Sequence, residues 1–281
     1  MNARRIFIAT VHWNSNEWVE RQTYRARKHI GENIRIFAFM DGVTSDLFSL
    51  VDKYFQNSEL SHPEKLDYLA NRIGEEATPD DILIFLDGDA FPIADISPII
   101  AQLSEYPLVA VRRDENFGDQ QPHPCFCITT VGFWQSIAGS WASGSEWERD
   151  DGSFGTDVGG KLYGILKDSE VEWRPLLRSN IVDLHPLFFG VYAGCIYHHG
   201  AGFRNKLCRR DARTGMDSYS RKCLRFIEIC QGKRYLRPLR VTLRRHIYWY
   251  MSKRNENLHR RVTALISSEE NFARILGFLP T

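Results

Sequence analysis

The chain has 281 residues, of which 43% are hydrophobic and 25% charged. This is the balance of a globular protein with one large α/β domain and an appendage, or with two small domains. Its six cysteines form no CxxC pair, which argues against a disulfide scaffold and favours reduced thiols in a cytoplasmic protein. No apolar run is long enough for a signal-peptide core or a bilayer span.

The net charge of +1 conceals an uneven distribution. Residues 1–202 hold 17 Lys and Arg against 29 Asp and Glu, whereas residues 203–261 hold 18 against 4. An acidic body therefore carries a basic tail. Such asymmetry indicates either an anionic partner for the tail or ion pairs between the two parts.

Short apolar runs alternate with helical patterns in the first third of the chain. Strands are predicted at 5–11, 34–40 and 82–86, and helices at 17–30, 45–55 and 64–73. Because strands separated by helices form βαβ units, we expect an α/β fold with a mostly parallel sheet.

The pattern continues less regularly up to a composition break near Arg204. Further strands are predicted at 108–111, 126–131, 173–177 and 188–197, and further helices at 96–105, 133–141 and 158–166. The polar, turn-rich stretch 112–124 has the length of a functional loop.

The strand predicted at 82–86 consists of five apolar residues and is followed directly by Asp87, Gly88 and Asp89. In an open α/β sheet, ligands bind at the carboxyl ends of the strands. Two carboxylates at that edge suit Mg²⁺ or Mn²⁺, which can bridge the oxygens of a diphosphate. The alternative is that these three residues only form a turn, since Asp and Gly are common in turns.

A second motif, His199-Gly-Ala-Gly202, follows the last predicted strand. Together, the two motifs resemble those of nucleotide-sugar glycosyltransferases of the GT-A type, and the His-x-x-Gly pattern is similar to that of glycosyltransferase family 8. The likeness covers about residues 5–205. It departs from the family at Asn205, which stands where the family has a lysine.

The resemblance implies a GT-A, Rossmann-like sheet flanked by helices. Residues 1–205 would form the catalytic domain that binds the nucleotide-sugar, and residues 206–281 a basic helical extension. The implied activity is transfer of a sugar from a nucleotide-diphosphate donor to a hydroxyl acceptor, in glycan or cell-envelope polysaccharide synthesis.

The resemblance also implies the metal ligands. Asp89 would bind Mn²⁺ or Mg²⁺ directly, while Asp87 would contact the ribose and a metal-bound water. Such a cation stabilises the charge that builds on the departing diphosphate. One imidazole can complete the shell. His198 and His199 are adjacent, so they should point to opposite faces, and His199 is favoured because it begins His-x-x-Gly. Alternatively, both histidines pack or are solvated.

Further residues are candidates for binding the donor. Strand ends near a nucleotide should contact its base, and the helix before the metal strand commonly faces the ribose in GT-A enzymes. A glycine-rich turn with basic neighbours would let backbone amides approach the diphosphate. These considerations predict donor contacts from Thr10, His12, Trp13, Asp41, Lys65, Asp67, Gly202, Arg204 and Lys206. The same side chains could simply pack or be solvated.

Asp157, which precedes Val158 and a glycine pair, is the candidate catalytic residue. In an inverting enzyme it would be the general base that deprotonates the acceptor. In a retaining enzyme, which the likeness to family 8 favours, it would orient the donor or stabilise the reacting centre. It could instead be an N-cap. His123, Thr129, Thr130 and His185 are secondary candidates for the acceptor cleft.

The basic tail interleaves aromatic and cationic residues, as in 244–251. Helices of this type can lie on an anionic membrane surface, which would suit a glycan or lipid-linked acceptor and a place at the inner face of a membrane. Packing on the acidic body is the alternative. Two other functions compete with glycosyl transfer: a phosphatase of the haloacid dehalogenase type, and a nucleic-acid binder, which the acidic body disfavours.

Overall fold

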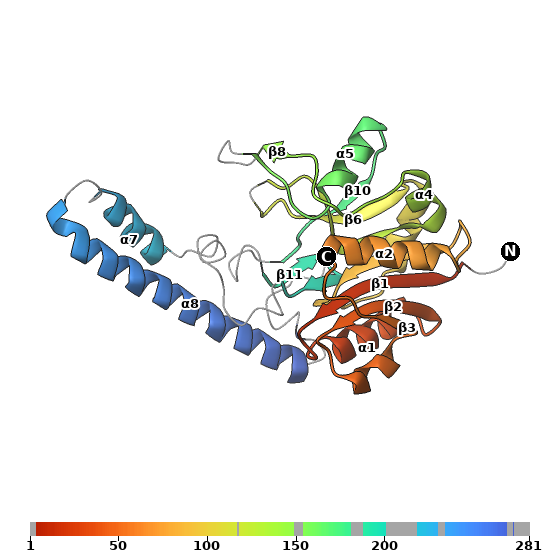
Figure 1. Cartoon of the computed structure of the whole chain (residues 1–281), viewed down its shortest axis with the longest axis horizontal. Coiled ribbons are helices and arrows are strands. Elements are labelled where there is room, and N and C mark those ends of the chain that lie inside the picture. Colours follow the sequence, from red (N-terminus) through yellow and green to blue (C-terminus); the bar gives the residue numbers. More distant parts are fainter. Residues whose placement is uncertain are drawn as a thin grey trace.

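A computed structural model of the protein describes residues 4–116, 118–148, 154–180, 188–200, 218–229, 234–268 and 272 (Figure 1). Its centre is a seven-stranded sheet in the order β10-β6-β7-β4-β1-β2-β3. The strands are β1 (Ile6–Trp13), β2 (Ile34–Asp41), β3 (Lys53–Phe55), β4 (Ile82–Asp87), β6 (Leu108–Arg112), β7 (Pro122–Thr130) and β10 (Arg174–Leu176). Only β7 runs antiparallel to its neighbours β4 and β6. The predicted mostly parallel α/β sheet is confirmed.

Helices cover both faces of this sheet (Figure 1). They are α1 (Val19–Ile30), α2 (His62–Gly74), α3 (Ser97–Ala101), α4 (Val131–Ser136) and α5 (Gly160–Asp168), with the 3-10 turns η1 (Ser45–Leu50) and η2 (Gln102–Ser104). Residues of α1 and α3 belong to one buried cluster, and residues of α2, α4 and α5 belong to the cluster on the other face.

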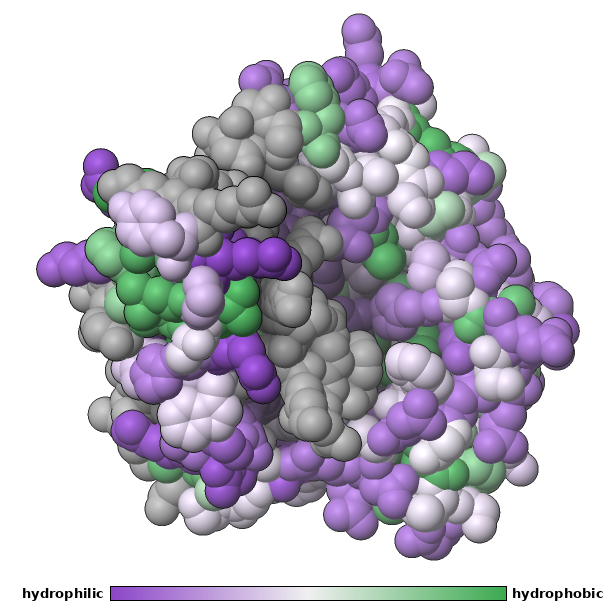
Figure 2. Space-filling view, turned by 60° about the vertical axis from the view of Figure 1, so that its left-hand side comes forward, coloured by the Kyte–Doolittle hydropathy of each residue, from purple (hydrophilic) through white to green (hydrophobic). Residues whose placement is uncertain are grey.

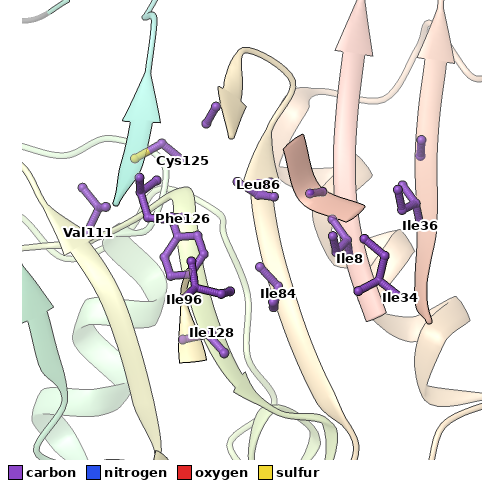
Figure 3. Packing of buried hydrophobic residues seen from close by; sticks show 14 of the residues in the cluster. Ile8, Ile34, Ile36, Ile84, Leu86, Ile96, Val111, Cys125, Phe126 and Ile128 are labelled. Carbon is purple, nitrogen blue, oxygen red and sulfur yellow. The ribbon is translucent and has the colours of Figure 1, made fainter. Parts of the chain in front are cut away.

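The central strands are apolar on both sides because both of their faces are covered. On the α1 face, Ile8, Ile34, Ile84 and Ile128 come from four strands and pack together with Ile96 (Figure 3). Alternate residues of the same strands, such as Phe7 and Phe85, point to the α2 face. This two-sided burial explains why these runs do not alternate between apolar and polar residues.

The helix predicted at 45–55 is wrong in its second half. Only η1 is helical, and residues 53–55 form β3, which pairs in parallel with β2. The Asp52 carboxylate accepts the Ile36 N–H at 2.8 Å and the Asp52 N–H donates to the Ile36 carbonyl at 2.9 Å. These bonds to the sheet edge outweigh the local preference for helix.

Two small sheets complete the body: a pair formed by β8 (Trp147–Glu148) and β9 (Phe154–Gly155), and a three-stranded sheet in the order β11-β12-β5. The latter contains β5 (Ala90–Pro92), β11 (Gly190–Tyr192) and β12 (Ile196–His198), all antiparallel. The single strand predicted at 188–197 is therefore a hairpin. Since β5 directly follows the Asp87-Gly88-Asp89 turn, this sheet brings β12 beside that turn.

Beyond the body, α7 (Ser218–Ile229), the 3-10 turn η3 (Arg234–Leu236) and α8 (Arg237–Ser268) form the predicted helical tail. Helix α7 lies along the first half of α8 and contacts it through Ile227 and Ile247 (Figure 1). Near its other end, α8 contributes Val262 and Ile266 to a buried cluster with Trp18 of the body. No described helix is both long and apolar enough to cross a membrane.

Candidate active site

The carboxyl ends of three neighbouring parallel strands meet at one edge of the sheet. Val11 pairs with Asp87 across β1 and β4, and Trp13 pairs with Asp41 across β1 and β2. A cavity of about 700 Å³ lies at this edge, and its lining includes Asp87, Gly88 and Asp89. Its position is the one that the fold favours for a ligand.

The turn between β4 and β5 is fixed on both sides. The Gln22 side-chain amide of α1 donates to the carbonyl oxygens of Asp87 and Ala90, both at 2.7 Å. On the other side, a Cβ at Gly88 would overlap the Val11 carbonyl oxygen. Glycine is therefore required by close approach of the backbone, and the two carboxylates are held in place.

Three side chains of this edge converge on one point. The His198 Nε2 lies 3.4 Å from Asp89 Oδ1 and 3.6 Å from Asp87 Oδ2. One ligand atom from each residue lies within 4.8 Å of the other two. Two carboxylate oxygens and one imidazole nitrogen fit a divalent cation such as Mn²⁺ or Mg²⁺. We call Asp87, Asp89 and His198 the triad.

The structure places His198 beside the aspartates, and not His199 as the motif predicted. His199 points to the opposite side of the chain, where its Nδ1 lies 2.9 Å from the Tyr197 hydroxyl and its Nε2 lies 3.0 Å from His259 Nδ1. Burial, reinforced by His259, lowers the pKa of His199 to about 3. The prediction that the two histidines diverge is met, but a His-x-x-Gly pattern does not reveal which one faces the site.

The protonation states of the site follow from burial and from neighbours. Burial alone would raise the pKa of Asp87, but the His62 Nε2 at 3.1 Å and two further histidines outweigh it and lower that pKa. Burial lowers the pKa of His12 to about 4. At neutral pH the site therefore combines an ionised Asp87 with a neutral His12.

The β1, β2 and α2 side of the cavity contains several of the predicted donor contacts. His12, Trp13 and Lys65 line it, together with Ser61 and His62, which sequence reasoning missed. Ser61 is the N-cap of α2, and its N–H donates to Glu64 at 2.7 Å. The stretch Ser61-His62-Pro63 showed that a helix begins here, but gave no sign that His62 would reach Asp87.

Two other predicted donor contacts lie behind this wall. Asp41 is not among the lining residues but forms a buried ion pair with Lys65, with 2.6 Å between Oδ2 and Nζ. Thr10 is fully buried and donates at 2.9 Å to Gln22, the residue that holds the turn. Both support residues of the cavity instead of lining it.

Three predicted residues have bonds elsewhere and do not line the cavity. Asp67 accepts the Ser140 hydroxyl at 2.7 Å and the Trp141 N–H at 2.8 Å, so it holds the chain after α4. Thr129 donates to the Pro107 carbonyl at 2.8 Å. Thr130 is the N-cap of α4. Their polar groups serve the local structure, which their spacing could not reveal.

Asp157 lines the cavity, as its proposed role requires. It is not the N-cap of α5, because Gly159 occupies that position with a φ of 104°. The Asp157 carboxylate accepts the N–H of Val158 at 2.9 Å. The predicted residues His185, Gly202, Arg204 and Lys206 lie outside the described residues.

The β6–β7 side of the cavity is lined by Arg113, Asn116 and His123. His123 was a secondary candidate, whereas Arg113 and Asn116 were missed. The loop at 112–124 was recognised by its length, but nothing in its composition showed which residues turn inwards. These side chains complete a cavity that has polar groups on both sides of the triad.

Comparisons with known proteins find similarity only among solved structures. No family model matches the chain, and no curated protein does. The solved structures include residues 1–349 of S. aureus TarS in complex with UDP-GlcNAc, with 10% identity over 49% of this chain and 48% of that fragment, at a TM-score of 0.37. This chain thus spans about half the length of that relative.

Two further neighbours are also glycosyltransferases. The glycosyltransferase GlyE of Streptococcus pneumoniae TIGR4 is 14% identical over 62% of this chain and 45% of GlyE, with a TM-score of 0.36. The galactosyltransferase LgtC, in complex with donor and acceptor sugar analogs, is 12% identical over 47% of this chain and 59% of LgtC, with a TM-score of 0.32. The likeness is one of fold.

Proposed function

We propose that this protein is a metal-dependent glycosyltransferase that uses a nucleotide-diphosphate sugar. The observation that carries the proposal is the triad of Asp87, Asp89 and His198 in a cavity at the carboxyl edge of a parallel sheet. Hard oxygen ligands with one imidazole suit a cation that binds phosphate oxygens. When bound, such a cation would stabilise the charge on the departing diphosphate.

The residues on the β1 and α2 side would bind the nucleotide. Trp13 is 49% exposed at the rim, so its indole offers a face on which a base can stack. His12 is neutral and buried in the wall, so it offers a hydrogen bond to a polar ligand atom without adding charge. Lys65, fixed by Asp41, supplies positive charge beside the triad.

Asp157 would act on the transferred sugar or the acceptor. In an inverting reaction it would accept the proton of the attacking hydroxyl, and in a retaining reaction it would orient the donor. The family resemblance favours retention. The anomeric configuration of the product, read by NMR, distinguishes these roles. In an inverting enzyme, Asp157→Asn would abolish transfer while leaving donor binding intact.

The tail would carry the protein to a glycan or lipid-linked acceptor at a membrane surface. Ile229 is 68% exposed and Tyr235 77% exposed, both near the end of the α7–α8 pair that lies away from the body. In Figure 2, apolar residues on this side gather between strongly hydrophilic ones. Co-sedimentation of the whole protein with anionic vesicles, but not with neutral ones, would support this contact.

Nucleotide binding measured by calorimetry tests the main proposal. We expect UDP or GDP to bind at least about tenfold more tightly with Mn²⁺ than without it, and Asp89→Ala to remove this effect. Glu59→Gln is the matched control, because Glu59 lines the cavity outside the triad. Binding that is independent of metal in both wild type and Asp89→Ala would overturn the proposal. Hydrolysis of nucleotide-sugars with and without Mn²⁺ then identifies the donor.

A further inference from the structure

Two nitrogen atoms face each other across a short gap on the β6–β7 side of the cavity. The Arg113 Nη1 lies 3.5 Å from the His123 Nε2, and both residues line the cavity. The Arg113 side chain is only 12% exposed. Whether this contact is a hydrogen bond depends on which nitrogen of His123 carries its proton.

The backbone decides the tautomer. The Cys125 N–H donates to His123 Nδ1 at 3.1 Å, so Nδ1 uses its lone pair as an acceptor. A neutral imidazole with an unprotonated Nδ1 carries its proton on Nε2. Burial and the charge of Arg113 lower the pKa of His123 well below its usual value, which agrees with a neutral ring. The facing atoms are therefore both donors and do not bond to each other.

The other edge of the Arg113 guanidinium is directed at protein groups. Its Nε lies 3.8 Å from the Glu115 carboxylate, which is also 3.9 Å from Arg178 and accepts the Tyr192 hydroxyl at 2.6 Å. A nearby carboxylate, that of Asp119, accepts from Gln121. Glu115 thus anchors Arg113 from behind, while Nη1 lies beside His123.

The donor pair lies on one particular side of the triad. In the sheet, β6 and β7 lie on the opposite side of β4 from β1 and β2, which carry the groups proposed to bind the nucleotide. The rings of His123 and His198 are 5.9 Å apart. A group bound between Arg113 and His123 would therefore belong to the part of the substrates beyond the metal, which is the transferred sugar or the acceptor.

We propose that Arg113 and His123 bind an anionic oxygen, of a carboxylate or a phosphate, on the transferred sugar or on the acceptor. An anionic oxygen on the cavity side of the pair, within hydrogen-bond reach of both nitrogens, accepts from both N–H groups at once. Hydrogen bonds from a guanidinium to an anion are among the strongest in proteins. This inference rests on the proposed function, since it assumes that the nucleotide occupies the other side. It makes the protein an enzyme of acidic sugars or of phosphate-bearing acceptors.

Calorimetry in two arms tests the proposal and separates the two sources of the charge. In the first arm, UDP-glucuronate is compared with UDP-glucose in the presence of Mn²⁺. In the second, protein saturated with UDP and Mn²⁺ is titrated with glucuronate, glucose and inorganic phosphate. We expect a charged ligand to bind about tenfold or more tightly than its neutral counterpart in one arm, and the arm identifies the source.

Arg113→Gln should reduce the ratio of charged to neutral affinity to about one. Arg112→Gln is the matched control, because Arg112 is the preceding residue, pairs with the exposed Asp114 at 2.7 Å and does not line the cavity. His123→Asn, whose amide oxygen can still accept the Cys125 N–H, should lower the ratio by a smaller factor and provides a second variant should Arg113→Gln fail to fold.

The outcomes for the two proposals are distinct. If neither UDP nor GDP binds with Mn²⁺, the proposed function fails, and if only GDP binds, the two arms are run with GDP and GDP-linked sugars. If UDP binds but charged and neutral ligands bind equally in both arms, or if the preference persists in the variants of Arg113 and His123, the anion site is overturned while the proposed function stands.

Discussion

The Nε2 of His199 lies 3.0 Å from the Nδ1 of His259, which joins the strand beside the active site to the long C-terminal helix. His199 directly follows His198, the last residue of β12. The N–H of His199 donates to the Asp89 carbonyl at 3.0 Å. His198, the third member of the triad, is thus held directly by its pairing with β5 and indirectly, through His199, by α8.

We therefore expect His259→Ala to weaken metal-dependent nucleotide binding without touching the cavity. Because His259 reaches His198 only through the neighbouring His199, the loss in metal affinity should be smaller than the roughly 10- to 100-fold that follows loss of a residue bonded directly to a metal ligand. The measurement is the Mn²⁺ concentration that gives half-maximal UDP binding, together with the melting temperature. His259→Asn, which keeps a polar group near the position of Nδ1, should recover much of the loss. Equal Mn²⁺ requirements for wild type and His259→Ala would contradict the prediction.

The two adjacent histidines should respond differently to substitution. His198→Ala removes an imidazole nitrogen from the triad, so the Mn²⁺ requirement should rise by about 10-fold or more while the fold persists. His199→Asn disturbs a buried contact with Tyr197 and His259 and should mainly lower the melting temperature. Paired Mn²⁺ titrations and thermal melts check this. The reverse pattern would restore the ligand that the sequence motif predicted.

Gly88 offers a test of how tightly the turn is built. Gly88→Ala should destabilise the protein by about 1–3 kcal/mol and weaken nucleotide binding, because the new Cβ meets the backbone of Val11. Gly74→Ala is the control, since its Cβ would meet only the end of the Gln135 side chain, which can move. Denaturant unfolding and UDP titration measure both effects. A Gly88→Ala protein with wild-type stability and affinity would show that the turn adapts.

Asp81, at the amino end of the metal strand, should make stability depend on pH. Burial opposes its ionisation, but hydrogen bonds from Arg5 and Thr78 outweigh burial and lower the pKa of Asp81 to about 2. A carboxyl group with a pKa lowered in the folded state stabilises the fold above its unfolded pKa of about 3.9, and this contribution disappears as the pH falls towards 2.

Asp81→Asn should accordingly cost about 1–2 kcal/mol at pH 7, a figure reduced because the Arg5 side chain is 45% exposed. The difference from wild type should shrink as the pH is lowered from 4 to 2. Denaturant unfolding at several pH values measures it, with Asp80→Asn, an exposed neighbour, as the control. A difference independent of pH would mean that charge plays no part.

The fold was largely predictable because each central strand is a continuous apolar run that is buried on both faces of the sheet. The exceptions have a common physical cause. Residues 53–55 have a helical spacing, yet the edge of β2 offers them hydrogen bonds that no local pattern encodes. The hairpin of β11 and β12 likewise depends on pairing with β5, which lies about a hundred residues earlier in the chain.

The candidate site was most predictable where a strand end carries its own chemistry, as at Asp87 and Asp89. Lys65, His123 and Asp157 were also candidates and also line the cavity. The direction in which His198 and His199 point is set by the register of β12 against β5. From the sequence, Asp67 and Trp13 were both candidates for contacting the donor. Tertiary contacts direct Asp67 to Ser140 instead and leave Trp13 at the rim of the cavity. His62 lies at the start of a helix, and Arg113 and Asn116 lie in a loop. In such segments no repeating hydrophobic pattern shows which side chains point inwards.

The length of helix α8 sets the distance between the outer end of the tail and the body. Arg237 and His259 are separated by 22 positions, which at 1.5 Å per residue corresponds to about 33 Å along the helix axis. An α8 standing upright with its first turn on a lipid surface would hold the catalytic cavity several sugar units above that surface. Under the proposed membrane contact, such a standoff would favour the outer end of an extended glycan over a bare lipid headgroup. Shortening α8 by whole turns would then change the length of glycan chain that is accepted.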